Sequence, residues 1–443
     1  MGTMPIGKLL ISMALPMMLS MMVQALYNIV DSVFVSRISE DALTALSLAF
    51  PVQNLMIAVS SGTGVGINAL LSRNLGEKKF ADANRAACNG ILLAMLGAAA
   101  FLLFGLFGTD FFFRAQTDIP GILESGRDYL SIICIGSVFL FGQITFERLL
   151  QSTGRSTYSM ISQISGAALN IILDPIMIFG LLGFPAMGTA GAALATIVGQ
   201  AVACGVGLVL NLKKNDEIRL ALKQMRPHGP TIGQIYKVGV PSIIMMAIGS
   251  VMTLGMNNIL MGFSSTATAI FGVYFKLQSF AFMPVFGMNN AMVPIIAYNY
   301  GARRRDRIVG TIKLACAIAI CILLVIMMLF QLFPGQFLAL FDASEHMLSM
   351  GVPALRIITT HFIFAGFGIT AGAVFQALGN GLLSLITSAA RQLLVLLPTA
   401  YLLSLSGDVN LVWWAFPIAE LVSMLLSSLF MRYIYKKEIV PLG

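Results

Sequence analysis

Apolar stretches long enough to cross a lipid bilayer recur about twelve times along this chain. A membrane-spanning α-helix needs about 20 mostly apolar residues. Backbone groups in hydrocarbon must be hydrogen-bonded within their own segment, so continuous stretches of this length must be helices rather than barrel strands. Hydrophobic residues make up 58% of the sequence and charged residues only 10%, which excludes a water-soluble globule. We therefore predict an all-α membrane protein with twelve transmembrane helices.

The sequence also matches itself at a separation of 225 residues, as in Pro16 and Pro241 or Gly154 and Gly379. The matches concentrate at the ends of apolar stretches and continue without a gap from Pro16 to Gly154. Six spans in each half is an even number, so both halves enter and leave on the same face of the membrane. The repeat is therefore parallel, and we predict two pseudo-symmetric six-helix bundles.

The predicted bundles cover residues 1–210 and 235–443, and a polar, charged linker at residues 211–234 joins them. Pro227 and Pro230 would end a surface helix in this linker. No stretch of the sequence is long enough for a separate soluble ATPase domain. We therefore expect an ion gradient, or the gradient of a substrate, to supply the energy for any transport.

Counting the N-terminus with Lys8 as the first, every second loop carries most of the basic residues, including those at residues 73–85, 213–237 and 303–313. By the positive-inside rule, both termini and the linker face the cytoplasm, and the chain crosses the plasma (inner) membrane many times. The net charge of +8 is then an orientation signal beside anionic lipid. The alternative is that Arg303, Arg304 and Arg305 bind nucleic acid, but we expect the lipid bilayer as partner and no nucleic acid.

Two acids lie inside predicted spans of the first half, Asp31 in the first span and Asp174 in the fifth. Ionisable residues inside a membrane are costly and usually functional. Their repeat-related positions hold Met256 and Thr399, which carry no charge. The first bundle therefore has a chemical role that the second lacks.

Polar residues continue from each acid along one helical face. Gln24, Tyr27 and Asn28 share a face with Asp31, and Asn170 lies four residues before Asp174. Such an acid-lined pocket could share one proton between the carboxylates or bind a hard cation such as Na⁺ through oxygen ligands. The alternative is a structural role, in which each carboxylate is hydrogen-bonded to a neighbouring helix or a cationic side chain.

Other charged residues in the spans are weaker evidence of a functional site. Adjacent Glu147 and Arg148 fit an ion pair that ties helices, or a position at the cytoplasmic edge. We expect Lys276 and Arg391 to pair with backbone carbonyls or with each other, and the alternative is that they contact the substrate. We expect Glu420 to be interfacial or structural. No nucleophile and base, metal-ligand spacing or HExxH motif is visible at membrane depth, so we expect no enzyme, no catalytic residue and no cofactor.

The chain resembles the MATE family, the multidrug and toxic compound extrusion transporters. The residues that carry this resemblance are Leu15-Pro16 with Gln24, Tyr27 and Asp31, Gly76-Glu77-Lys78, Gly154-Arg155, Asn170-Ile-Ile-Leu-Asp174-Pro175, and Gly191-Ala-Ala-Leu-Ala-Thr196. The resemblance implies twelve helices in two bundles that form a V around a central cavity.

The resemblance also implies antiport of cationic drugs against protons or sodium ions. Its cation or proton site would be Asp31, Asn170, Asp174 and Thr196, with Gln24, Tyr27 and Asn28 in the substrate cavity. Members that couple to sodium through the second bundle carry acids in spans 7 and 10, and this chain has none there, so coupling to a proton or a sodium ion in the first bundle remains. We favour the proton because two nearby carboxylates suffice for it. We expect a monomer. The alternative function is a flippase for lipid-linked or other polyanionic substrates, which would need a basic cavity.

Overall fold

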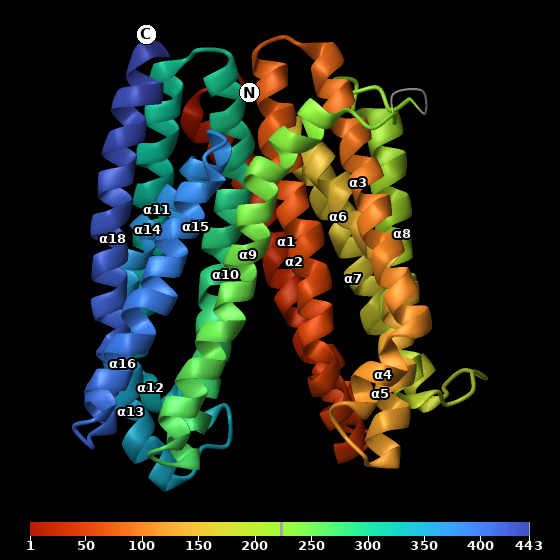
Figure 1. Cartoon of the computed structure of the whole chain (residues 1–443), viewed down its shortest axis with the longest axis vertical. Coiled ribbons are helices and arrows are strands. Elements are labelled where there is room, and N and C mark those ends of the chain that lie inside the picture. Colours follow the sequence, from red (N-terminus) through yellow and green to blue (C-terminus); the bar gives the residue numbers. More distant parts are fainter. Residues whose placement is uncertain (222–224, 443) are drawn as a thin grey trace. The chain divides into compact units, whose positions relative to one another are not determined.

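The computed structural model describes residues 1–221 and 225–442, and Lys223 of the predicted linker lies outside these ranges. Within them the chain is helical and forms no strand (Figure 1). Ten helices are long and apolar enough to cross a membrane, and the number rises to 12 if each of two bent helix pairs counts as one span. The prediction of an all-α membrane protein with twelve transmembrane helices is therefore confirmed.

The helices of the first half are α1 (Ile6–Ser36), α2 (Glu40–Gly76), α3 (Phe80–Phe107), α4 (Thr109–Arg114), α5 (Pro120–Ile135), α6 (Ser137–Ser152), α7 (Ser156–Phe179) and α8 (Gly188–Lys214). Those of the second half are α9 (Gly229–Met261), α10 (Ser265–Gly301), α11 (Arg305–Leu332), α12 (Pro334–Ala339), α13 (Glu345–Thr359), α14 (Phe362–Ala377), α15 (Gly381–Ala389), the π-helix η2 (Ala390–Leu396), α16 (Leu397–Ser404), α17 (Val409–Val412) and α18 (Ala415–Ile434). A short π-helix, η3 (Tyr435–Ile439), and a 3₁₀ helix, η4 (Val440–Leu442), follow α18.

The internal repeat of the sequence is visible in these bounds. Helices α2 and α10, α3 and α11, and α6 and α14 begin and end 225 residues apart. The pairs α5–α6 and α13–α14 bend by 46° and 48° at the same place in each half. Gly154 and Gly379 both adopt the left-handed conformation, with φ of 81° and 82°. Glycine suits this conformation because it has no Cβ to clash. Two copies of one helical scaffold are present.

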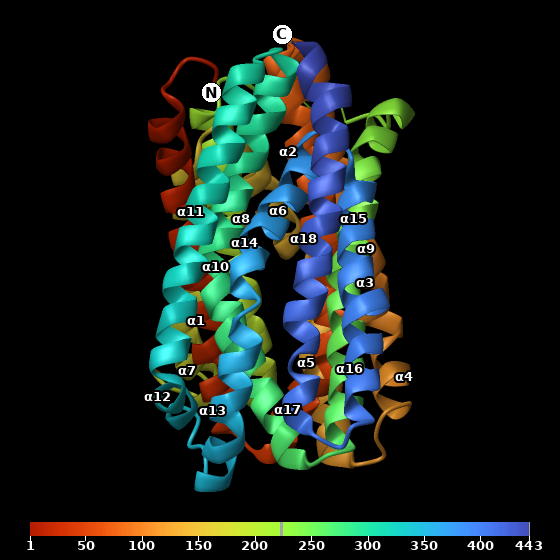
Figure 2. The ribbon, with the colours of Figure 1, turned by 90° about the vertical axis from the view of Figure 1, so that its left-hand side faces the viewer.

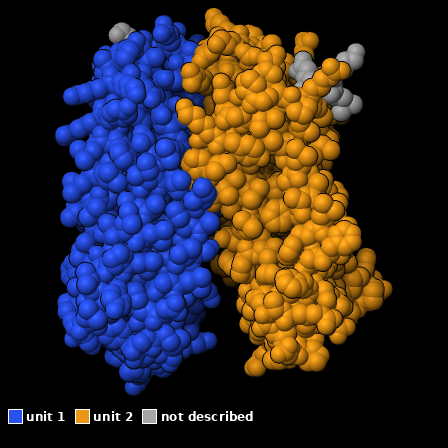
Figure 3. Space-filling model, viewed as in Figure 1, with its two compact units in different colours: residues 1–18, 244–443 blue, residues 19–243 orange. Residues whose placement is uncertain are grey.

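The chain forms two compact units, coloured separately in Figure 3. Unit 2 is Leu19–Ile243, and unit 1 combines Met1–Met18 with Ile244–Gly443. Compared with the bundles expected from the sequence, the first 18 residues join the second half and the linker joins the first. Helices α1 and α9, of 31 and 33 residues, are each divided between the units. Helices of this length extend beyond the roughly 30 Å hydrocarbon core, so their two ends can pack in different surroundings.

The divisions of α1 and α9 occur at related places. The division of α1 follows Met18, two residues after Pro16, and the division of α9 follows Ile243, two residues after Pro241. A proline inside a helix removes one backbone hydrogen bond and favours bending there. Each long helix therefore passes from one unit to the other next to its own weakest turn.

Candidate functional site

The site is built on α7 of unit 2, which carries Asn170 and Asp174 one turn apart. Both side chains are buried, with 3% of Asn170 and 0% of Asp174 exposed. Pro175 follows Asp174 within the helix and cannot donate to the carbonyl of Ile171. The helix ends at Gly180, whose left-handed φ of 73° closes the last turn. The sequence thus places a carboxylate next to a weakened stretch of backbone inside the unit.

Asn170 joins Asp174 to Thr196 on the neighbouring helix α8. With its amide oriented to satisfy both groups, Asn170 donates to Oδ2 of Asp174 at 3.2 Å and accepts the backbone N–H of Thr196 at 3.1 Å. Amide orientation is assigned from such partners. The structure therefore brings together three of the four residues predicted for the cation or proton site.

Asp31, the fourth residue, lies on the part of α1 that belongs to unit 2. Its side chain is half-buried, and its Oδ1 atom is buried without a hydrogen-bond partner among the described residues. Its carboxylate interacts electrostatically with Asp174 and with the phenol groups of Tyr27 and Tyr129. No ion pair joins Asp31 or Asp174 to a basic side chain in the part of the chain that the structure describes. The two acids thus share a buried environment that no protein cation neutralises.

The three residues predicted for the substrate cavity differ in burial and in their hydrogen-bond partners. Gln24 accepts a hydrogen bond at 3.0 Å from Nε2 of Gln163, which ties α1 to α7. Tyr27 is half-buried near the acids. Asn28 is exposed and takes no part in the hydrogen-bonded cluster of Asn170, Asp174 and Thr196.

Two polar residues of this region were not predicted from the sequence. Tyr129 on α5 is buried, and Nε2 of Gln53 on α2 donates to its hydroxyl at 3.0 Å. Gln53 interrupts an apolar stretch, which is the signal that could have identified it. Together they extend the polar surroundings of Asp31 onto two further helices.

Side-chain oxygens of Asp31, Asn170, Asp174 and Thr196 are ligands of the kind that hard cations prefer.

Close packing of α7 against α8 holds the cluster in place. A Cβ on Gly166 would be 2.6 Å from the backbone oxygen of Gly199, and a Cβ on Gly199 would be 2.7 Å from that of Gly166. Only glycine permits the two backbones to approach this closely. The approach brings Thr196 within hydrogen-bonding distance of Asn170.

Other charged residues inside the spans have partners that the sequence did not reveal. Nη1 of Arg391 donates to Oε2 of Glu420 at 3.0 Å, so the predicted pairing of Arg391 with Lys276 or a backbone carbonyl is wrong. The reason is that η2 and α18 pack against each other. Glu147 accepts from Gln143 one turn earlier, whereas Arg148 donates to Gln151 one turn later.

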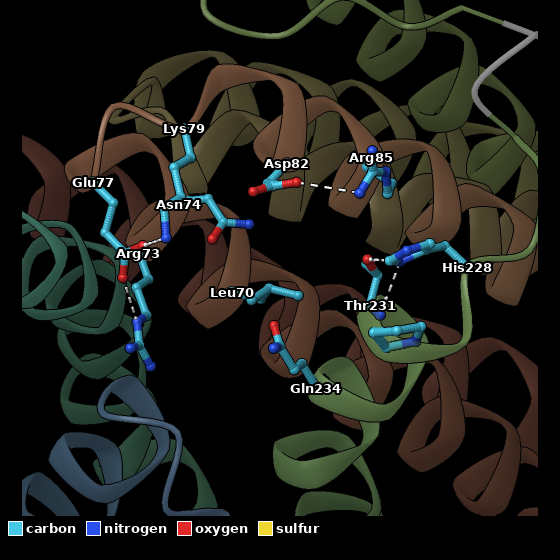
Figure 4. A pocket seen from close by; sticks show the side chains of 11 residues that line it. Leu70, Arg73, Asn74, Glu77, Lys79, Asp82, Arg85, His228, Thr231 and Gln234 are labelled. Carbon is cyan, nitrogen blue, oxygen red and sulfur yellow. Dashed lines mark hydrogen bonds and ion pairs between the residues drawn. The ribbon is translucent and has the colours of Figure 1, made fainter.

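A separate polar cavity of about 250 Å³ lies at the helix ends of unit 2, between the α2–α3 turn and the start of α9 (Figure 4). Its charged side chains already have partners, since Glu77 pairs with Arg73 at 2.9 Å and Lys79 at 2.7 Å, and Asp82 with Arg85 at 3.3 Å. Although partial burial opposes ionisation, hydrogen bonds from Lys79 and Arg73 hold the pKa of Glu77 below its ordinary value.

The same end of unit 2 holds the linker. The backbone N–H of His228 donates to Oδ1 of Asn89 at 2.9 Å, and that of Arg219 donates to Oδ1 of Asn84 at 2.8 Å. We interpret the cavity as a junction that anchors the linker rather than as a substrate site.

Comparisons with known proteins agree with this architecture. A family model described as MatE matches residues 16–176 and 241–402. The multidrug export protein MepA of Staphylococcus haemolyticus (strain JCSC1435) is 26% identical over 95% of this chain and 92% of its own length. MepA of Staphylococcus aureus (strain MSSA476) is 26% identical over 96% and 93%.

The solved structures similar to this chain are also those of transporters. The outward-facing conformation of a multidrug resistance MATE family transporter of the MOP superfamily is similar with a TM-score of 0.91 and 26% identity, over 98% of this chain and 96% of that one. A MOP superfamily transporter from Pyrococcus furiosus Vc1 gives the same four values, 0.91, 26%, 98% and 96%.

Proposed function

The chain belongs to the MatE family of membrane transporters, and on that premise we propose that it is a secondary active multidrug efflux antiporter. Its substrates are cationic amphipathic compounds, and the coupling ion is a proton or a sodium ion. The carboxylates of Asp31 and Asp174 carry the proposal, because they lie inside unit 2 without a basic partner among the described residues. The staphylococcal relatives named multidrug export protein support the export of several compounds.

In the proposed mechanism the coupling ion and the drug compete for the same negative charge. Ionised Asp31 and Asp174 attract a cationic compound, and a proton or sodium ion that neutralises them releases it. Asn170 holds the Asp174 carboxylate in place through its hydrogen bond. The unpaired Oδ1 of Asp31 is the atom available to accept a shared proton or a cation.

An ion gradient is sufficient to drive such an exchange. One proton exchanged for one singly charged cation moves no net charge, so the pH gradient and not the membrane potential supplies the free energy, about 1.4 kcal/mol per pH unit. This free energy corresponds to a concentration ratio of about 10 for the exported compound. We favour the proton over sodium because two neighbouring carboxylates suffice to share a proton, whereas a cation needs a more complete shell of oxygen ligands.

We propose that the moving part is α1, which bends at Pro16. The proline cannot donate to the carbonyl of Ser12, so this turn lacks one backbone hydrogen bond. The division of α1 between the two units, only two residues later, supports this place for the bend. A change of charge at Asp31, on the unit 2 part of the helix, would then alter the bend.

Dye efflux from proteoliposomes tests the proposed function. Vesicles loaded with ethidium, a lipophilic cation, are diluted into buffer that is one pH unit more acidic, or that contains sodium absent from the interior. We expect the inward proton gradient to accelerate ethidium efflux, because inward proton movement drives outward movement of the dye. Efflux that responds only to sodium would assign the coupling ion to sodium. Efflux that responds to neither gradient would contradict antiport.

We also propose that both termini and the linker face the cytoplasm, as the distribution of basic residues favours. Arg304→Cys and Asp118→Cys, both at exposed loop positions, report the two sides when introduced into a variant without the five native cysteines. A membrane-impermeant maleimide is expected to label Asp118→Cys in intact cells. Arg304→Cys should react only after permeabilisation. The reverse pattern would overturn this orientation.

A further inference from the structure

Unit 1 contains a charged pair that the proposed mechanism does not use. Nη1 of Arg391, on η2, lies 3.0 Å from Oε2 of Glu420, on α18. Only 5% of the Glu420 side chain is exposed, whereas 32% of the Arg391 side chain is exposed. Helix α14 and the helix formed by α15, η2 and α16 lie beside α18 (Figure 2).

The pair lies deep in the predicted membrane region. Arg391 is ten residues from the beginning of a 24-residue span, Gly381–Ser404. At 1.5 Å per residue this is about 15 Å along the helix, half the thickness of the hydrocarbon core. Phosphate groups of lipids do not reach this depth. A guanidinium group here is costly and is therefore expected to have a function.

The scaffold itself does not require the pair. The repeat-related positions in unit 2 are Gly166 and Ala195, which carry no charge. Gly166 packs directly on the backbone of α8, so these positions of unit 2 pack without a charged side chain. In unit 1 the helix instead widens into a π-helix, just before Pro398. Local π segments of this kind are frequent at functional sites.

Arg391 retains unused hydrogen-bonding capacity. A guanidinium group has five N–H donors and binds carboxylates best through two parallel hydrogen bonds. Arg391 makes a single hydrogen bond, to one oxygen of Glu420, among the described residues. Its remaining donors, on a side chain that is one-third exposed, are available to a second carboxylate.

The surroundings offer a further donor and an aromatic surface. The backbone of Gly368 on α14 packs closely on the pair, since a Cβ there would be 3.3 Å from Oε1 of Glu420. Tyr274, which is 1% exposed, interacts electrostatically with both members of the pair, and its hydroxyl has no partner in the described part of the chain. The buried ring of His361 packs edge-on to Tyr274 at 6.4 Å between centroids. An aromatic surface thus lies beside the charged pair.

We propose that Arg391 binds the carboxylate of an amphipathic compound inside unit 1, with Glu420 as the internal anion that the ligand displaces. Glu420 neutralises Arg391 when no ligand is bound, which reduces the cost of the buried guanidinium. The ligand class is an apolar or aromatic carboxylic acid, including zwitterions that also carry an amine. The inference adds such compounds to the cationic substrates, and it rests on the proposed function only for the assumption that the bound compound is transported.

Fluorescence energy transfer from tryptophan to pyrene tests this binding directly. The only two tryptophans, Trp413 and Trp414, lie just before α18, and Trp414, its N-cap, is six residues, or about 9 Å, from Glu420. The probes are 1-pyrenebutyrate and its methyl ester, which differ in the negative charge. The wild-type protein in detergent is expected to bind the acid at least tenfold more tightly than the ester.

Three variants separate ligand binding from a structural role. Arg391→Gln is expected to bind acid and ester equally. Arg391→Lys should retain part of the preference, since it keeps the charge but loses the planar fork. Glu420→Gln should bind the acid several-fold more tightly, because the competing carboxylate is gone. Retained ester binding shows that each variant is folded.

Equal binding of acid and ester by the wild-type protein, or an unchanged preference in Arg391→Gln, would overturn the proposal and leave the pair as a tie between helices. The double variant Arg391→Gln/Glu420→Gln, which leaves no unpaired charge, keeps the test valid if a single variant does not fold. The measurement uses no ion gradient, so its failure is distinguishable from failure of the ethidium antiport.

Discussion

Replacing Asp174 with Asn is expected to reduce gradient-driven ethidium efflux at least tenfold while the protein remains folded. The amide has the shape of the carboxylate and can still form a hydrogen bond with Asn170, but it cannot ionise. A tenfold loss of rate corresponds to about 1.4 kcal/mol. Asp31→Asn is expected to have the same effect, because the buried Oδ1 of Asp31 is the proposed proton acceptor.

Initial efflux rates in proteoliposomes under an imposed pH gradient measure this effect. The matched control is Asp110→Asn, which removes an exposed carboxylate that pairs with Arg114 at the end of α4. We expect the control to export at the wild-type rate, because surface ion pairs contribute little. Wild-type rates in both Asp31→Asn and Asp174→Asn would exclude these acids as the coupling site.

Gly199→Ala is expected to cost about 1–3 kcal/mol of stability and to abolish export. The new Cβ would lie 2.7 Å from the backbone oxygen of Gly166 and 3.1 Å from Cβ of Asn170. Backbone atoms cannot move aside as a flexible side chain can, so α8 must separate from α7. This separation breaks the hydrogen bond between Asn170 and Thr196.

Thermal unfolding in detergent and ethidium efflux together measure this effect. Gly205→Ala is the matched control, because Gly205 lies on the same helix and its added Cβ would meet no atom within 4 Å. The control is expected to melt at or above the wild-type temperature, since alanine is favoured over glycine by about 1 kcal/mol inside a helix. Equal melting temperatures and export rates for the two variants would refute the role of the Gly166–Gly199 contact.

Much of the fold could be predicted from local features. The lengths of the apolar stretches indicated twelve spans, and two of these are bent pairs whose breaks the hydropathy did not reveal. Helix ends repeat because turn chemistry is local, as with the N-caps Ser39 and Ser264, which accept backbone hydrogen bonds at 3.0 and 3.1 Å.

The candidate site was predictable only in part. Helical periodicity placed Asn170 and Asp174 on one face, whereas Thr196 was identified only through the family resemblance. Tyr129 was missed, and Arg391 was assigned the wrong partner. Each of these contacts joins two helices, and the pattern along one helix does not determine how that helix is rotated against its neighbour.

Span length, helix ends and residue identity are local properties, and they were enough to establish a duplicated set of membrane helices with an acid pair in one half. Helix packing was needed to show that Asp31 interacts electrostatically with Asp174, that Arg391 pairs with Glu420, and that α1 and α9 are divided between two units. Those outcomes depend on how closely backbones approach, as at Gly166 and Gly199, and helix packing sets that distance.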